Sequence, residues 1–166
     1  MADDALLNLS ARLGAALKQR GWTLALAESC TGGMAAQCVT AIPGSSAWFE
    51  RGFITYSNAA KVEMLGVAET TLQQFGAVSE QTAREMAAGA LQHSHAQVAA
   101  AITGIAGPDG GAEAKPVGMV WFAWTARDGS PHSEMRCFSG DREAIRRQAV
   151  EAVFQGVIQL TLCTDL

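Results

Sequence analysis

The sequence has few charged side chains, no excess of positive charge and no long apolar run. Among its 166 residues, Asp, Glu, Lys and Arg make up 17%, and 12 Lys and Arg stand against 16 Asp and Glu, for a net charge of −4. A surface that binds DNA or RNA needs a dense cationic stripe, and a membrane span needs about 18–20 apolar residues. The first residues are acidic where a secretory signal is basic. We therefore expect a cytoplasmic protein that binds neither nucleic acid nor membrane.

Motifs for metals and common cofactors are also missing. The four cysteines form no C-x-x-C pair and have no histidine at zinc-finger spacing, so neither a disulfide scaffold nor a zinc site is expected. The absence of G-x-G-x-x-G and G-K-[ST] argues against NAD and ATP. No G-x-S-x-G elbow is present. The histidines are poor candidates for a general base, because His93 and His95 fall at an expected exposed helix end and His132 in an expected hairpin turn. We expect no metal and no organic cofactor.

Length and apolar content fit one globular domain, expected over residues 1–166. Apolar spacing predicts helices over residues 5–20, 34–39, 59–65, 80–92 and 142–160. Apolar and β-branched runs predict strands over residues 23–27, 48–56, 98–102, 117–126 and 133–138, the last two joined as a hairpin. Ser79 is the expected N-cap of one helix, and Ser139 or Asp141 that of the last. This alternation predicts an α/β fold, a three-layer α/β/α sandwich around a mixed, mostly parallel sheet.

Ser29 lies between an apolar run and the glycine pair Gly32 and Gly33, at an expected helix N-terminus. Free backbone N–H groups around residues 31–33 could stabilise a developing oxyanion there, so the Ser29 hydroxyl is a candidate nucleophile. Two alternatives stay open. Ser29 or Thr31 could simply cap the helix, since both residue types are favoured N-caps, and the neighbouring Cys30 is a competing nucleophile.

Lys61 is the candidate general base for Ser29. It follows Tyr56 and Asn58 at an expected strand-to-helix junction, which could aim a phenol, an amide and an amine at one point. A lysine with the reference pKa of about 10.4 is neutral in only about one molecule in a few thousand at pH 7. Burial or a nearby cation must therefore lower its pKa by about three units. We expect Lys61 to be largely withdrawn from solvent, because an exposed lysine would be an ordinary surface charge.

Two further segments could contact an anion or a polar group. The glycine-rich residues 103–111 can present backbone amides, although a tight turn after a buried strand explains them equally well. Arg142, at the start of the last expected helix, offers a planar guanidinium to a phosphate or carboxylate. Arg146 and Arg147, one turn further on, are interpreted as a solvated face.

Six ordered motifs together resemble the CinA C-terminal domain family, the stand-alone nicotinamide-nucleotide amidases. They are AESCTGG at residues 27–33, GSS at 44–46, GFITYSN at 52–58 with Lys61, GAVS at 76–79, TGIAGPDGG at 103–111 and FSGDR at 138–142. The likeness runs from the first expected helix to the last, with no departure at the motif positions. The sequence lacks the molybdopterin-binding-like N-terminal domain of full-length CinA proteins, so it is similar to the short, single-domain form.

The resemblance implies hydrolysis of the carboxamide of nicotinamide mononucleotide to nicotinate mononucleotide and ammonia, in pyridine-nucleotide (NAD) salvage. It implies Ser29 as the nucleophile and Lys61 as its base, without a metal or organic cofactor, and assistance from Tyr56, Thr103 and Arg142. Substrate contacts are expected from Cys30, Thr31, Gly32, Gly33, Asn58, Gly104 and Gly107. A binding module that keeps the fold without turnover is the alternative function. A homodimer is the expected assembly.

Overall fold

The computed structural model describes residues 4–163, so the ends of the expected domain, residues 1–3 and 164–166, lie outside the described residues. The helices are α1 (Asp4–Arg20), α2 (Met34–Thr40), α3 (Asn58–Leu65), α4 (Glu69–Phe75), α5 (Glu80–Gln92) and α6 (Arg142–Leu162), with a short 3-10 helix η1 (Ser45–Ala47). The strands are β1 (Leu24–Glu28), β2 (Phe49–Ile54), β3 (Val98–Gly104), β4 (Met119–Ala126) and β5 (His132–Cys137). All the expected helices and strands are present, and α4 is an addition that the sequence analysis did not predict.

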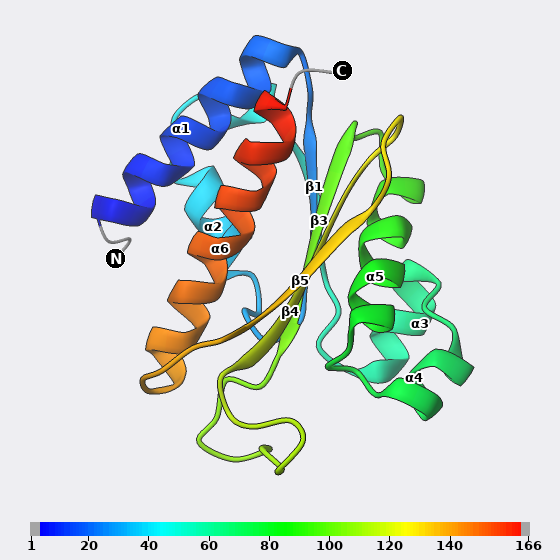
Figure 1. Cartoon of the computed structure of the whole chain (residues 1–166). Coiled ribbons are helices and arrows are strands. Elements are labelled where there is room, and N and C mark those ends of the chain that lie inside the picture. The colour runs from blue at the N-terminus through cyan, green and yellow to red at the C-terminus, as the bar shows by residue number, and fades with distance from the viewer. Residues whose placement is uncertain (1–3, 164–166) are drawn as a thin grey trace.

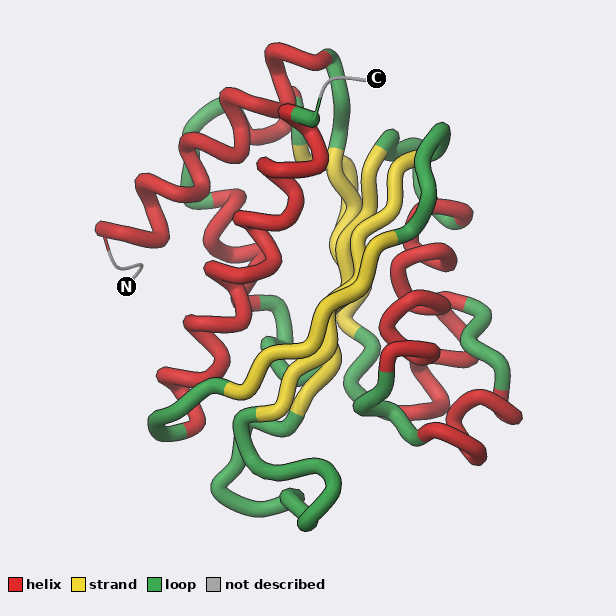
Figure 2. The backbone as a smooth tube through the Cα atoms, in the orientation of Figure 1, coloured by secondary structure: helices red, strands yellow, loops and turns green. Residues whose placement is uncertain are grey.

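The five strands form one sheet in the order β2-β1-β3-β4-β5. β1 pairs in parallel with β2 and β3, whereas β4 runs antiparallel to β3 and β5. Four of the five strands therefore point the same way, and the predicted mixed, mostly parallel sheet is confirmed. The strong twist of this sheet is visible in Figure 2.

Helices cover both faces of the sheet, as the predicted three-layer sandwich requires. Figure 1 shows α1, α2 and α6 on one face and α3, α4 and α5 on the other. The alternation of side chains along β1 separates the two cores: Leu24 and Leu26 pack in the core that contains α1 and α6, and Ala25 and Ala27 pack in the core that contains α5. The second core is built mostly from alanines, which lets α5 approach the sheet closely.

The α6 helix packs against β4 through a small residue. The indole Nε1 of Trp124 donates to the Val153 carbonyl at 2.9 Å, and a Cβ at Gly156 would overlap the Trp124 ring. Asp141 begins this helix, because its carboxylate accepts the Ala144 N–H at 2.9 Å, which decides between the two expected caps. No helix within residues 4–163 is long and apolar enough to cross a membrane.

The carboxyl ends of β1, β2 and β3 meet at one edge of the sheet, because these strands run in parallel. Three connections start there: the turn 29–33, the short link 55–57 and the glycine-rich loop 105–118. The long loop lies at the bottom of the view in Figure 1. Ligands of open α/β sheets bind outside the carboxyl ends of the strands, so this edge is the place to look for a site.

Candidate active site

A lysine and a serine meet at this edge of the sheet. Ser29 directly follows β1, and Lys61 lies in the first turn of α3. The Lys61 Nζ donates a hydrogen bond to the Ser29 Oγ at 3.0 Å. Both side chains are buried, Lys61 with 1% of its surface exposed and Ser29 with 8%. The predicted withdrawal of Lys61 from solvent is confirmed.

Neighbouring strands set the separation of these two residues. Glu28 and Ile54 are opposite one another in the β1–β2 ladder, and the Thr55 N–H continues it by donating to the Glu28 carbonyl at 2.8 Å. The chain then turns directly into α3, whose N-cap Ser57 accepts the Ala60 N–H at 3.0 Å. Lys61 is therefore carried back over the end of β1.

Burial makes the neutral form of the Lys61 amine more accessible than it is in an exposed lysine. Burial lowers the pKa of Lys61 from 10.5 to about 8, against a small opposing effect of the Cys30 thiol. Its amine also donates to the carbonyls of Thr55 at 2.8 Å and Tyr56 at 3.3 Å. With a pKa near 8, about one amine in ten is neutral at pH 7, compared with one in a few thousand for an exposed lysine.

A cavity of about 270 Å³ opens onto Ser29 and Lys61. All five predicted catalytic residues line it, namely Ser29, Tyr56, Lys61, Thr103 and Arg142. Of the residues expected to contact substrate, Cys30, Gly104 and Gly107 also line it. The glycine-rich loop thus forms a wall of the same cavity that holds the serine and the lysine.

Arg142 and Tyr56 join the loop to β2 at the rim of this cavity. The Arg142 Nη1 donates to the Gly107 carbonyl at 2.7 Å, and its Nη2 donates to the Tyr56 hydroxyl at 3.1 Å. Thr103 is buried and donates its hydroxyl to the Ala77 carbonyl at 2.8 Å. The rim therefore carries an arginine and a phenol, and the interior carries hydroxyl and amine groups.

The other four residues expected to contact substrate, Thr31, Gly32, Gly33 and Asn58, do not line the cavity. The Thr31 hydroxyl donates to the Glu28 carboxylate at 2.7 Å. The amides of Gly32 and Gly33 are engaged as well, by the Ser29 carbonyl at 3.0 Å and by Glu28 at 3.2 Å. Asn58 lines a different hollow, between α3 and α4.

The helix-capping alternative for Ser29 and Thr31 is wrong. The N-cap position of α2 is Gly33, with a left-handed φ of 104° and no side-chain cap. The carboxylate of Glu28 instead accepts two amides in the first turn of α2, those of Ala35 and Ala36, at 3.0 Å each. The Ser29 hydroxyl therefore does not cap α2.

Two residues at this site were missed by the sequence analysis. Glu28 is a buried carboxylate bonded to the turn that follows it. Arg146, interpreted from the sequence as part of a solvated face, donates to the carbonyls of Cys30 at 3.1 Å and Thr31 at 2.9 Å. One signal was available for each: Glu28 directly precedes Ser29, and Arg146 follows Arg142 by one helical turn.

Cys30 is a poor rival to Ser29. Its thiol is buried, and burial raises the pKa of Cys30 from 9.0 to about 11, although Arg146 and Lys61 favour the thiolate. The thiolate is the nucleophilic form of cysteine, and it is scarce at neutral pH when the pKa is so high. At neutral pH, Cys30 is therefore mostly the thiol, which is the less nucleophilic form.

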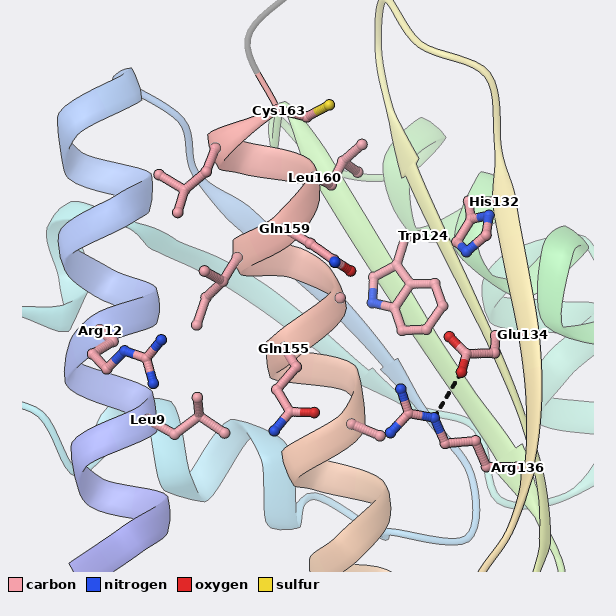
Figure 3. A pocket seen from close by; sticks show the side chains of 14 residues that line it. Leu9, Arg12, Trp124, His132, Glu134, Arg136, Gln155, Gln159, Leu160 and Cys163 are labelled. Carbon is pink, nitrogen blue, oxygen red and sulfur yellow. Dashed lines mark hydrogen bonds and ion pairs between the residues drawn. The ribbon is translucent and has the colours of Figure 1, made fainter.

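A larger hollow, of about 780 Å³, lies between α1, α6 and the β4–β5 hairpin. Figure 3 shows its Trp124 and His132 rings and the ion pair between Glu134 and Arg136, whose atoms are 2.7 Å apart. Its lining holds no serine or threonine beside a base. Within residues 4–163, no group of three or more His, Cys, Asp or Glu side chains could hold a metal ion. The smaller cavity is therefore the better candidate.

Comparisons with known proteins agree with the geometry. The model of the CinA C-terminal domain matches residues 6–161. The chain is 58% identical over 154 residues to "Nicotinamide-nucleotide amidohydrolase PncC" of Enterobacter agglomerans, covering 93% of each chain. It is 57% identical over 159 residues to the protein of the same name from Escherichia coli K12, covering 96% of each.

Solved structures show the same fold. The competence/damage inducible protein CihA of Agrobacterium tumefaciens superposes with a TM-score of 0.91 at 47% identity, over 93% of this chain and 94% of that one. A CinA superfamily protein of Escherichia coli superposes with a TM-score of 0.90 at 38% identity, over 96% and 93%. On the family match, the sequence identity and the shared fold, the chain belongs to the CinA C-terminal domain family.

Proposed function

We propose that this protein hydrolyses the carboxamide of nicotinamide mononucleotide, giving nicotinate mononucleotide and ammonia, as a step of pyridine-nucleotide salvage. The observation that carries the proposal is the 3.0 Å contact between the Lys61 amine and the Ser29 hydroxyl in a buried cavity. An activated serine is the nucleophile that amide hydrolysis needs. The names of the relatives, nicotinamide-nucleotide amidohydrolases at 57–58% identity, support this choice of substrate.

The reaction we propose has two halves. Neutral Lys61 takes the proton of the Ser29 hydroxyl while the oxygen attacks the amide carbon. The resulting ammonium of Lys61 returns that proton to the leaving nitrogen as the carbon–nitrogen bond breaks, so ammonia leaves and an ester to Ser29 remains. Lys61 then takes a proton from water as the water oxygen attacks the ester, and the ammonium of Lys61 gives that proton to the Ser29 oxygen as the ester bond breaks. The carboxylic acid that leaves loses its own proton to solvent.

The negative charge on the attacked oxygen needs hydrogen-bond donors. In the described part of the turn, the backbone N–H groups of Cys30 and Thr31 donate to no protein oxygen, whereas those of Gly32 and Gly33 do. We therefore assign the oxyanion to the first two amides and no longer to the glycines. Removing one such donor costs an enzyme about 10²–10³-fold in rate.

The other end of the cavity suits the nucleotide phosphate. Arg142 and the glycine-rich loop line the same cavity and are joined by the contact to Gly107. A guanidinium binds phosphate in a planar fork, and consecutive loop amides add donors. We propose that the two hold the phosphate together.

The test is ammonia release from nicotinamide mononucleotide by the wild type, Ser29→Ala and Lys61→Met. The wild type should release ammonia and both variants should not, while each binds the nucleotide. Equal release by wild type and Ser29→Ala would refute the serine mechanism, and binding without release by the wild type would make the protein a binding module. The same assay with free nicotinamide and with NAD gives the substrate range.

A further inference from the structure

We propose that Arg146 and Glu28 are positioning residues that hold the turn 29–33 in the shape that the Ser29 nucleophile requires. Neither side chain lines the cavity, so both would act through the backbone of the turn. The inference rests on the proposed function for its kinetic part, and on the contacts of the turn for the rest.

Glu28 holds the amide side of the turn. Glu28 is 1% exposed, and its carboxylate accepts four hydrogen bonds, at 2.7–3.2 Å, from the Thr31 hydroxyl and from the amides of Gly33, Ala35 and Ala36. Within residues 4–163 it forms no ion pair, so these neutral donors and the N-terminal end of α2 stabilise its charge. Removing the carboxylate would leave several buried donors unpaired.

Arg146 holds the carbonyl side of the turn. Its guanidinium is half-buried and reaches from the first half of α6 to two successive carbonyls, with Nε 3.1 Å from Cys30 O and Nη2 2.9 Å from Thr31 O. Hydrogen bonds from a charged donor are the stronger ones. Gly32 lies against the same guanidinium, because a Cβ at Gly32 would be 3.5 Å from the Arg146 Nη2.

The geometry of a trans peptide links these contacts to catalysis. Within one trans peptide unit, C=O and N–H point in opposite directions. The unit whose carbonyl belongs to Cys30 carries the N–H of Thr31, so Arg146, by fixing the carbonyl, turns that N–H away from itself. The bond between the Gly32 N–H and the Ser29 carbonyl orients the Cys30 N–H in the same way. Arg146 therefore sets the direction of the Thr31 N–H, and the closed shape of the turn, which Glu28 holds through Thr31 and Gly33, sets the direction of the Cys30 N–H.

A purely structural role of Arg146 and Glu28 predicts a different result from a positioning role. A residue that only stabilises the fold lowers the melting temperature and changes the rate of the folded enzyme little. A positioning residue slows the reaction of Ser29 in protein that is still folded, since a displacement of about 1 Å costs about 10²-fold in rate. The rate per folded molecule is the quantity that separates them.

The first test compares Arg146→Gln with Arg147→Gln. Arg147 is the next residue of α6 and pairs with Glu143 at 3.8 Å, so its substitution removes the same charge from the same helix and leaves the two bonds from Arg146 to the turn in place. Each variant is labelled on Ser29 with a fluorophosphonate, followed by intact mass, and assayed for ammonia release under conditions where its melting curve shows it folded. We expect Arg146→Gln to label and turn over about 10²-fold more slowly, with KM little changed.

Arg146→Lys should recover part of the rate. A lysine keeps the charge but is a point donor, whereas arginine offers a fork that matches two carbonyls. Equal labelling of folded Arg146→Gln and Arg147→Gln would overturn the proposal. So would a Gln variant that matches the Lys variant, because positioning by charged hydrogen bonds requires them to differ.

Glu28 is tested through Thr31, since Glu28→Ala leaves four donors without a partner and is expected to unfold the turn. Thr31→Val removes the hydroxyl that donates to Glu28 at 2.7 Å and keeps the shape, and Thr31→Ser keeps the hydroxyl. We expect slower labelling of the valine variant, by about tenfold, and wild-type labelling of the serine variant. Wild-type labelling of both would remove Glu28 from the proposal.

The two readouts separate this proposal from the proposed function. Fluorophosphonate labelling measures the nucleophile without the substrate. If the wild type labels on Ser29 but releases no ammonia, the proposed substrate is wrong and the labelling rates still decide on Arg146 and Glu28. If ammonia is released and the labelling rates of the variants do not differ, the function stands and the positioning role fails.

Discussion

Replacing Lys61 by methionine should remove a pH-dependent penalty from the folded state. Burial lowers the pKa of Lys61 from 10.5 to about 8. Between these pH values the unfolded chain holds a proton on Lys61 that the folded protein has released. Stability rises with pH wherever the unfolded state binds more protons. The penalty is therefore fully present below pH 8 and is relieved as the pH rises from 8 to 10.5.

The magnitude follows from the two pKa values. A difference of about 2.5 pKa units at about 1.36 kcal/mol each amounts to about 3.4 kcal/mol for the complete titration. Between pH 7 and pH 9.5, the free energy of unfolding of the wild type should rise by about 2 kcal/mol relative to Lys61→Met. Methionine also leaves the Thr55 carbonyl without its donor, but this loss is the same at both pH values and cancels in the comparison.

The measurement is denaturant unfolding of three proteins at the two pH values: wild type, Lys61→Met and Lys18→Met. Lys18 is exposed on α1, so its replacement should shift stability equally at both. In the same pH range, ammonia release by the wild type should rise about tenfold between pH 7 and 9 and then level off. A difference between wild type and Lys61→Met that does not change with pH would refute the assignment of a depressed lysine.

Three further substitutions test the site and its support. Cys30→Ala should keep the amidase activity, because burial raises the pKa of the thiol to about 11; loss of ammonia release would revive a cysteine mechanism. Gly156→Ala should cost about 1–3 kcal/mol, since a Cβ there would overlap Trp124, and calorimetry should show a lower Tm than for Gly129→Ala, where there is room. Asp141→Ala should lower the free energy of unfolding by about 1 kcal/mol through loss of the α6 cap, and Asp141→Asn should restore it in chemical denaturation.

The pair of Ser29 and Lys61 could be predicted from the sequence because each follows a local signal. Ser29 comes directly after the buried strand β1, and Lys61 lies in the first turn of the helix that follows the strand β2. Two parallel neighbours bring their carboxyl ends together, so residues that follow these strands meet. The fold followed from similar local signals, the spacing of apolar residues and the glycines between elements.

Arg146 could not be placed in the same way. Its acceptors, the carbonyls of Cys30 and Thr31, lie 116 and 115 residues away along the chain. A charged residue on a helix is usually solvated, and only the docking of α6 against α2 turns this one inward. The partners of Glu28 are near in sequence, but their directions depend on the left-handed turn at Gly32 and Gly33.

The α4 helix was missed because its own residues carry no burial signal. None of its seven residues is buried, so it shows no apolar stripe to predict it. Its start is held from outside, because the Glu85 carboxylate on α5 accepts the Ala68 N–H at 2.9 Å and the Thr71 hydroxyl at 2.6 Å. Asn58 was expected at the cavity but lies in the hollow beside α4.

Ser29 and Lys61, the proposed catalytic pair, differ in how firmly the fold holds them. Ser29 follows β1, which is paired on both sides, whereas Lys61 follows β2, an outer strand with no fully buried residue. Local opening events occur at much lower free energy than global unfolding where few apolar contacts resist them. A brief detachment of β2 would carry Lys61 away from Ser29 while the core stays closed. The temperature at which activity is lost should therefore correlate with the rate of amide exchange with deuterium along β2, and not with the melting temperature.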